Sequence, residues 1–193
     1  MSAEWDGGWW RGALRVPSPN FSARPAGARV DTVVLHSISL PPGRFGGPAI
    51  EELFLNRLDW DADPYFDEIR GIEVSAHFLI RRTGELVQFV SCDERAWHAG
   101  VSAWRGRDAC NDFSIGIELE GVEGATFEAR QYEALTPLLA AIAARYPIAA
   151  VAGHEHVAPG RKRDPGAGFD WERLAASTGW PRARFSDVFG AAA

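Results

Sequence analysis

The sequence has few cysteines, no long hydrophobic run and no secretion signal. Its 193 residues include only Cys92 and Cys110, which cannot form a disulfide framework, so we expect free thiols and a cytoplasmic location. The most apolar stretch, residues 135–151, is interrupted by two prolines and an arginine and is too short to span a bilayer. The N-terminus begins Met-Ser-Ala-Glu-Trp-Asp, without the basic and apolar regions of a signal peptide. A membrane protein is therefore not expected.

An excess of basic charge is also missing. Twenty Lys and Arg residues stand against 26 Asp and Glu, which gives a net charge of −6 and an isoelectric point near 5.4. The longest basic run is Arg161–Arg163. Binding to nucleic acid without sequence preference needs a broad positive surface, so a nucleic-acid partner is not expected. The composition is typical of an acidic, soluble protein, which we expect to be a monomer.

The length and composition that remain are those of one globular domain. Hydrophobic residues make up 46% of the chain and charged residues 24%, which is ordinary for such a domain. The eight tryptophans are interpreted mostly as core residues. Residues 1–30 are rich in Pro, Gly, Ser and Trp and are expected to form an extended arm. The domain itself is expected over residues 31–180, with a C-terminal tail at 181–193.

Hydrophobic patterning predicts both strands and helices. We expect a hairpin of two strands, at residues 74–81 and 85–90, around a turn at Thr83-Gly84. Three further strands are expected at residues 31–36, 113–120 and 148–153. Helices are expected at residues 49–58, from an N-cap at Thr126 to about Tyr146 with Pro137 inside, and at 169–176. The fold class is therefore mixed α/β, with a central mixed sheet and helices packed on it.

Two histidines follow the predicted strands at places where sheets commonly form sites. His36 ends the first strand, and His154 follows the last one and opens a loop that also contains Lys162 and Asp164. Hydrolytic zinc sites use three protein ligands and keep one position for water, and His36, His154 and Asp164 could provide such a set. A carboxylate could then activate the water, and Lys162 could stabilise an oxyanion.

The acidic partner could come from the strand at 113–120. Its alternation places Ile115, Ile117 and Leu119 on one face and Glu118 and Glu120 on the other. The spacing alone also fits a simpler interpretation, in which Glu118 faces solvent and His154 and His156 form a solvated pair. Both interpretations stay open on these residues alone.

Five segments in one order carry a resemblance to a known family. They read VLHSISLPPG, VSAHFLI, AWHAG, CNDFSIGIELEG and GHEHVAPGRKRDPG, at residues 34–43, 74–80, 96–100, 110–121 and 153–166. Over about residues 14–175 the chain resembles the AmpD-type 1,6-anhydro-N-acetylmuramyl-L-alanine amidases. These belong to the zinc amidase family shared with phage T7-type lysozyme and peptidoglycan recognition proteins.

The resemblance implies one Zn²⁺ ion, held by His36, His154 and Asp164. It also implies that Glu118 handles the water and that Lys162 stabilises the oxyanion. The implied reaction is hydrolysis of the amide between the N-acetylmuramyl lactyl group and the L-alanine of a muropeptide. Cytoplasmic recycling of the cell wall, with an influence on β-lactamase induction, is implied with it.

The segments depart from the family at two positions near the expected substrate. Ser37 stands where the family commonly has Asn, and Ala109 stands where we expect a basic residue. Arg105 and Arg107 are close by and could bind substrate carboxylates instead. The motifs also suggest Trp97 and His98 as residues of the cleft wall, although His98 could equally be a packed residue. His77, in the middle of a predicted strand, is expected to be structural.

Two other functions remain open at this point. The chain could be a recognition module that binds muropeptides without cutting them, but such relatives typically lack a complete ligand set, which this chain retains. It could also be a secreted lysin that attacks intact wall, against which the acidic N-terminus argues.

Overall fold

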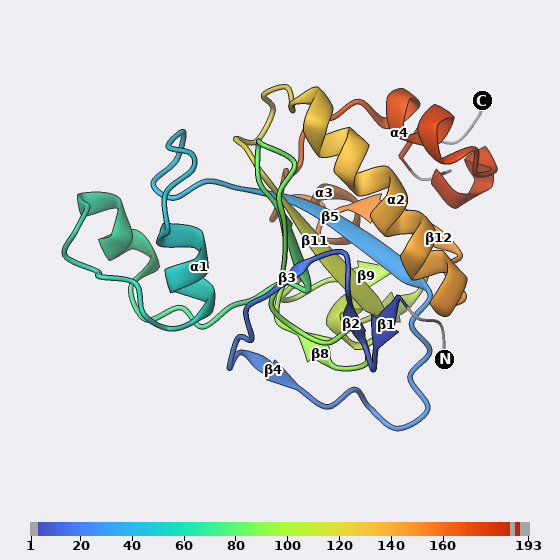
Figure 1. Ribbon diagram of the computed structural model, residues 1–193, viewed down its shortest axis with the longest axis horizontal. Coiled ribbons are helices and arrows are strands. Elements are labelled where there is room, and N and C mark those ends of the chain that lie inside the picture. The colour runs from blue at the N-terminus through green and yellow to red at the C-terminus, as the bar shows by residue number, and fades with distance from the viewer. Residues whose placement is uncertain (1–3, 186–187, 190–193) are drawn as a thin grey trace.

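The computed structural model describes residues 4–185 and 188–189, and a six-stranded sheet lies at its centre (Figure 1). In sheet order the strands are β12 (Ala150–Gly153), β5 (Thr32–Ile38), β11 (Ser114–Glu120), β6 (Phe78–Ile80), β7 (Leu86–Gln88) and β3 (Leu14–Arg15). The first four strands are parallel, β7 is antiparallel to β6, and β3 is parallel to β7. The expected mixed α/β class with a central mixed sheet is confirmed.

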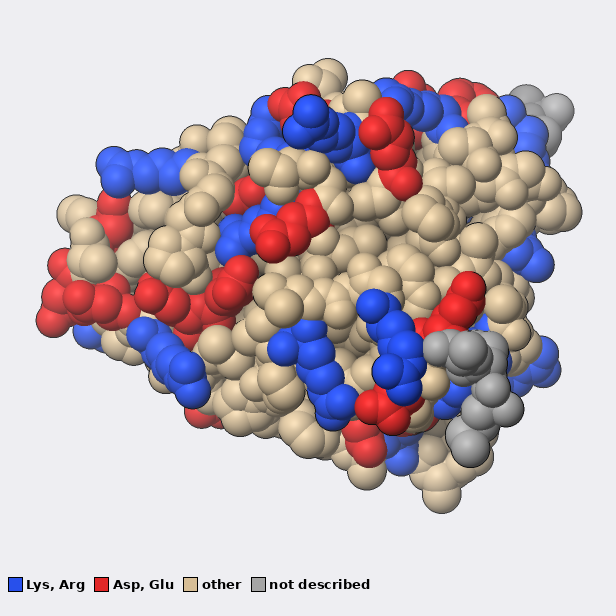
Figure 2. Space-filling view, in the orientation of Figure 1, with Lys and Arg blue, Asp and Glu red and all other residues tan. Residues whose placement is uncertain are grey.

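Helices cover the sheet on one side, and a small lobe projects beyond it. Figure 1 shows α2 (Ala129–Arg145) lying across the sheet with α4 (Trp171–Thr178) beside it. The short helices α1 (Ala49–Phe54) and η1 (Pro64–Ile69) form a separate lobe, called here the α1–η1 lobe. Figure 2 shows acidic side chains gathered over this lobe.

Short elements complete the described chain. They are β1 (Trp5–Asp6), β2 (Trp9–Trp10), β4 (Phe21–Ser22), β8 (Arg95–Ala96), β9 (Ala103–Trp104), β10 (Arg107–Asp108), η2 (Cys110–Asp112), α3 (His154–Val157) and η3 (Arg182–Phe185). Within the described residues, no helix combines the length and the apolarity needed to cross a membrane. Cys92 and Cys110 are both buried free thiols.

The main core lies between the sheet and α2. Side chains alternate across a strand, so Val33 and Leu35 of β5 and Ile115 and Ile117 of β11 all face the helix, where each is fully buried. The expected apolar stripe of α2 meets them and consists of Tyr132, Leu135, Leu138, Leu139 and Ile142. Burying one leucine or isoleucine side chain fully stabilises the folded state by about 1.5–3 kcal/mol relative to leaving it exposed. This packing leaves the alternate residues of β5 and β11 on the other face.

Several expected boundaries are wrong by a few residues. β5 continues to Ile38, so His36 lies within the strand rather than at its end. The predicted helix at 49–58 ends at Phe54. Asn56 has a φ of 57°, which is incompatible with a right-handed helix. The hairpin strands are confirmed but shorter, and residues 74–77 are not part of β6.

The predicted starts of α2 and α4 are also wrong. Thr126 is not an N-cap, because α2 begins at Ala129, where the Glu128 N–H donates to the Gln131 side chain at 3.0 Å. α4 begins at Trp171 because the Asp170 carboxylate accepts the Arg173 N–H at 2.9 Å. In α2 a side chain of the first turn marks where the helix begins, and in α4 the side chain of the N-cap residue does so.

The first 30 residues contact the sheet at several points. Leu14 and Arg15 pair with β7 as the edge strand β3. The Arg24 guanidinium donates to the carbonyl oxygens of Asn111, Asp112 and Ser114 at 2.9–3.0 Å. The division into arm, domain and tail stays a prediction, and residues 186–187 and 190–193 of the expected tail lie outside the described residues.

Candidate active site

The parallel register of β5 and β11 brings the first two candidate residues together. Glu118 pairs directly with His36 across the two strands, and both lie on the face turned away from α2. β12 ends at Gly153, opposite Leu35, so His154 emerges next to His36. A Cβ on Gly153 would lie 2.9 Å from both His156 Nδ1 and Pro165 Cδ, which is why a glycine precedes His154.

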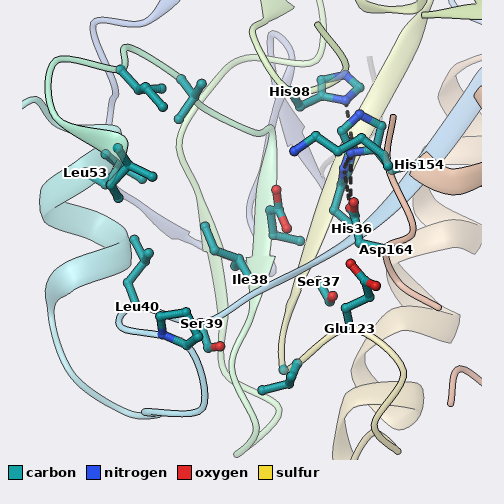
Figure 3. A pocket seen from close by; sticks show the side chains of 18 of the residues that line it. His36, Ser37, Ile38, Ser39, Leu40, Leu53, His98, Glu123, His154 and Asp164 are labelled. Carbon is teal, nitrogen blue, oxygen red and sulfur yellow. Dashed lines mark hydrogen bonds and ion pairs between the residues drawn. The ribbon is translucent and has the colours of Figure 1, made fainter. Parts of the chain in front are cut away.

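Three ligand atoms converge at this edge of the sheet. The His36 and His154 Nδ1 atoms lie 2.9 Å apart, and Asp164 Oδ2 is 3.2 Å from the first and 3.1 Å from the second (Figure 3). Asp164 comes from the loop after α3, where its carbonyl oxygen accepts the Glu155 N–H at 2.9 Å. A tetrahedral zinc ion with bonds of about 2.0–2.2 Å holds its ligand atoms about 3.3 Å apart. The spacing therefore fits a single metal ion.

The donor set fits zinc in its protonation as well. The His154 Nε2–H donates to the Ala99 carbonyl oxygen at 3.1 Å, so Nδ1 is the ring nitrogen that is left to bind a metal. Arg161 holds that carbonyl by a hydrogen bond of 2.6 Å. Burial lowers the pKa of His36 to about 4, so the His36 ring is neutral. Two imidazoles and a carboxylate aimed at one point are a common zinc ligand set.

Glu118 lies beside this cluster with little access to water. Its side chain is 8% exposed, and no described residue forms a hydrogen bond with its Oε2 atom. Burial, reinforced by the negative charge of Asp164, raises its pKa well above 4.5, and Lys162 opposes the shift. The solvent-facing interpretation of Glu118 is wrong, because its side chain is buried beside the cluster.

A cleft of about 710 Å³ opens in front of the cluster. Glu118 lines this cleft. Figure 3 shows the cluster on one side of it and Leu53 of α1 on the other. Lys162 lies at the exposed rim. Three of the substrate-binding candidates also line the cleft, namely Ser37, Trp97 and His98.

The two candidate arginines lie elsewhere. Arg107 forms an ion pair with Asp31 at 2.8 Å, at the start of β5. Asp31 lies five residues before His36 along an extended segment, which corresponds to about 16 Å. Arg105 stacks toward the Trp104 ring, 5.4 Å from its centroid, and neither arginine lines the cleft. The structure therefore does not bring these two side chains to the site.

Another histidine of the motifs, His77, makes hydrogen bonds to backbone groups. Its Nδ1 accepts the Gly116 N–H at 2.9 Å, and its Nε2–H donates to the Glu94 carbonyl at 3.1 Å. Burial first, and the charge of Arg24 second, lower its pKa to about 3. Such a ring is neutral and holds two segments together.

Sequence reasoning missed the groups that orient the ligands and the far wall of the cleft. The Ala99 carbonyl and Arg161 act through loop geometry, for which the sequence has no signal. Tyr65 and Ile69 of η1 line the cleft because the lobe folds over it. A helical pattern at 64–69 could have indicated η1, but not the surface it faces.

Comparison with known proteins agrees with this geometry. Residues 26–167 match the family described as N-acetylmuramoyl-L-alanine amidase. The chain is 52% identical over 173 residues to the 1,6-anhydro-N-acetylmuramyl-L-alanine amidase AmpD of Citrobacter freundii, covering 89% of this chain and 92% of that protein. It is 52% identical over 169 residues to AmpD of Escherichia coli K12, covering 86% and 92%.

Two solved structures extend the comparison. The crystal structure of a selenomethionine AmpD derivative has a TM-score of 0.87 at 52% identity, covering 89% of this chain and 97% of that one. The complex of E. coli AmiD with anhydro-N-acetylmuramic acid-L-Ala-D-γ-Glu-L-Lys has a TM-score of 0.58 at 32% identity, covering 80% and 60%.

Proposed function

Because the chain belongs to the N-acetylmuramoyl-L-alanine amidase family and is an amidase of the AmpD type, we propose that it depends on zinc and cleaves anhydro-muropeptides. The bond cut is the amide between 1,6-anhydro-N-acetylmuramic acid and the L-alanine of the stem peptide. One observation carries the proposal: the two Nδ1 atoms of His36 and His154 and the Asp164 carboxylate converge next to the buried carboxyl of Glu118.

His36, His154 and Asp164 would hold the zinc ion, which when bound polarises a carbonyl group and makes water more acidic. Glu118 takes the proton from the attacking water and delivers it to the nitrogen of the leaving amine. Its raised pKa suits a carboxyl group that must keep this proton between the two steps. The Lys162 ammonium at the rim stabilises the negative charge that develops on the carbonyl oxygen.

The cleft has the size and chemistry for a glycopeptide. Its volume of about 710 Å³ lies within the range of about 300–1,000 Å³ found for small-molecule sites. Trp97 and Leu53 offer apolar surface and Ser37 offers a hydroxyl group, so we assign substrate contacts to Trp97, Ser37 and His98. Arg105 and Arg107 have no such role, because neither lines the cleft. The AmiD complex contains an anhydro-muramyl tripeptide, which supports this substrate class.

The cellular role proposed here is cytoplasmic recycling of cell-wall fragments. The AmpD relatives are named for a 1,6-anhydro sugar. An internal 1,6 bond closes C1 of that sugar, so it can only end a glycan chain, as expected of a released fragment. Removing peptides from such fragments would also lower any signal that they give for β-lactamase induction.

We propose that the protein is a monomer, which analytical ultracentrifugation tests.

The experiment is a cleavage assay with zinc-loaded protein. Release of free tripeptide from 1,6-anhydro-N-acetylmuramyl-tripeptide is followed by mass spectrometry, before chelation, after chelation and after zinc is returned. We expect release that chelation abolishes and zinc restores. Binding of the muropeptide by zinc-loaded protein without release of peptide would instead support the alternative of a recognition module.

A further inference from the structure

We propose that His98 and Ser114 form a hydrogen-bond relay that positions His36 as a metal ligand. The relay consists of His36, His98, Ser114 and the carbonyl group of Cys110. It rests on the zinc site of the proposed function, and it makes His98 a positioning residue in addition to its place on the cleft wall.

The direction of every proton in the relay follows from its last member. The Cys110 carbonyl oxygen can only accept, and Ser114 Oγ lies 2.6 Å from it, so the serine hydroxyl donates its single proton there. Ser114 Oγ must then accept from the His98 ring, whose Nε2 is 3.2 Å away. His98 Nε2 therefore carries the ring proton, and His98 Nδ1 is a bare acceptor.

The same logic then reaches the metal ligand. His36 Nε2 lies 2.9 Å from His98 Nδ1, so the His36 proton must be on Nε2. A neutral imidazole has one N–H group, and His36 Nδ1 is consequently bare and directed at His154 Nδ1 and Asp164 Oδ2. One backbone carbonyl thus selects the tautomer in which His36 can bind a metal.

A backbone carbonyl group orients each of the two histidine ligands, one directly and the other through intervening side chains. His154 donates directly to the Ala99 carbonyl oxygen, whereas His36 reaches the Cys110 carbonyl through two side chains. Ligating histidines commonly donate their second N–H to such acceptors, and the loss of one typically weakens metal binding by about 10–100-fold. Because the connection from His36 runs through two side chains, replacing either His98 or Ser114 should disturb the orientation of the His36 ring.

The backbone beneath His98 shows that its place is specified. A Cβ atom on Gly116 would overlap the His98 ring, so the ring lies directly on the backbone of β11. A glycine inside a strand is unfavourable unless something approaches closely, and His98 is what approaches here. The backbone N–H groups of His98 and Ala99 also both donate to Asn111 Oδ1, at 3.2 and 2.8 Å, which fixes the backbone that carries the ring.

The first test measures zinc affinity by competition with a chelator of known affinity. His98→Leu fills the space without an acceptor, and we expect zinc binding about 10–100-fold weaker. His98→Asn can place its Oδ1 atom near the former Nδ1 position, and we expect it to restore most of the affinity. Ser114→Ala removes only the acceptor that orients His98, and we expect an intermediate loss.

Ser18→Ala is the matched control for Ser114→Ala. Ser18 is equally buried, donates to the Phe54 carbonyl oxygen at 2.5 Å and accepts the Asn20 N–H at 3.0 Å. Among the described residues, none of the hydrogen bonds of Ser18 reaches the cluster, so its loss should lower stability and leave zinc affinity unchanged. Equal zinc affinities for wild type, His98→Leu and Ser114→Ala would overturn the relay.

The second test reads the tautomers directly in the wild-type protein, so it does not depend on any variant folding. Long-range ¹H–¹⁵N spectra of the zinc-loaded protein with labelled histidines distinguish Nδ1–H from Nε2–H rings. We expect His98 as the Nε2–H tautomer, and an Nδ1–H ring would overturn the relay. Failure of the wild-type protein to bind zinc would refute the proposed function instead, so the two failures are distinguishable.

Discussion

Replacing Glu118 by Gln separates the chemistry of the site from its architecture. The amide keeps the shape of the carboxyl group but cannot take a proton from water. General acid–base catalysis contributes about 10²–10⁴-fold, which corresponds to about 3–5 kcal/mol in the activation free energy. We expect kcat to fall by that factor. Zinc content should not change, because Glu118 is not one of the three converging ligands.

The same substitution should change how the stability of the zinc-free protein depends on pH. Burial, followed by the charge of Asp164, raises the pKa of Glu118 above 4.5. The unfolded chain releases this proton near pH 4.5 and the folded chain only at higher pH, so the folded state binds more protons between the two values. The free energy of unfolding therefore falls as pH rises through this window, by up to about 1.4 kcal/mol per pH unit.

Glutamine has no proton to release, so the Glu118→Gln protein should lack this decline and be more stable than wild type above the window. The assay pairs tripeptide release with urea denaturation of zinc-free protein at several pH values from about 5 to about 8. A kcat within tenfold of wild type would refute the role of Glu118 as the base. An unchanged pH dependence of unfolding would refute the account of its burial.

Glu120→Gln is the matched control. Glu120 lies on the same strand and face and is 2% exposed, but it accepts the Gly46 N–H at 2.6 Å and pairs with Arg81 at 3.1 Å. Breaking a buried ion pair commonly costs about 3–5 kcal/mol. We expect this variant to lose stability at neutral pH while kcat changes by less than tenfold.

Three further substitutions test other parts of the molecule. Asp164→Ala removes one of the three ligands and should abolish both zinc retention, measured by metal analysis after dialysis, and tripeptide release. Arg107→Ala should leave KM unchanged and cost about 1 kcal/mol of stability, since its partner is the distant Asp31 in a partly exposed ion pair; a large rise in KM would contradict the assignment. Leu135→Ala, at a fully buried position of α2, should cost about 2–5 kcal/mol in urea denaturation without changing kcat.

Local patterns predict elements well where one face is apolar. The alternation in residues 113–120 and the helical stripe of α2 are both confirmed, because burial against a common core imposes periods of 2 and 3.6 residues. The helix ends were misplaced, because Gln131 and Asp170 decide them through single hydrogen bonds. Several residues near a helix start can form such a bond, and Thr126 is one of them, so the sequence alone does not show which residue caps the helix.

The chemistry of the candidate site could be read from the residues, but its arrangement could not. The residue types at 36, 118, 154, 162 and 164, together with the family resemblance, predict a hydrolytic zinc site before any fold is known. Which atoms meet depends on the register that pairs Glu118 with His36 and on the loop that returns Asp164 to them. Register and loop return are set by packing between segments far apart in the sequence.

By itself, the sequence determined the strand and helix types, the core residues and the set of groups able to hold a metal and move a proton. These follow from side-chain chemistry and short-range periodicity, which each segment carries with it. Only the tertiary structure decided that Arg107 pairs with Asp31 instead of lining the cleft, and that Ala99 and Cys110 supply the carbonyls that orient the two histidines. A backbone carbonyl is the same in every residue, so its role comes only from where the fold places it.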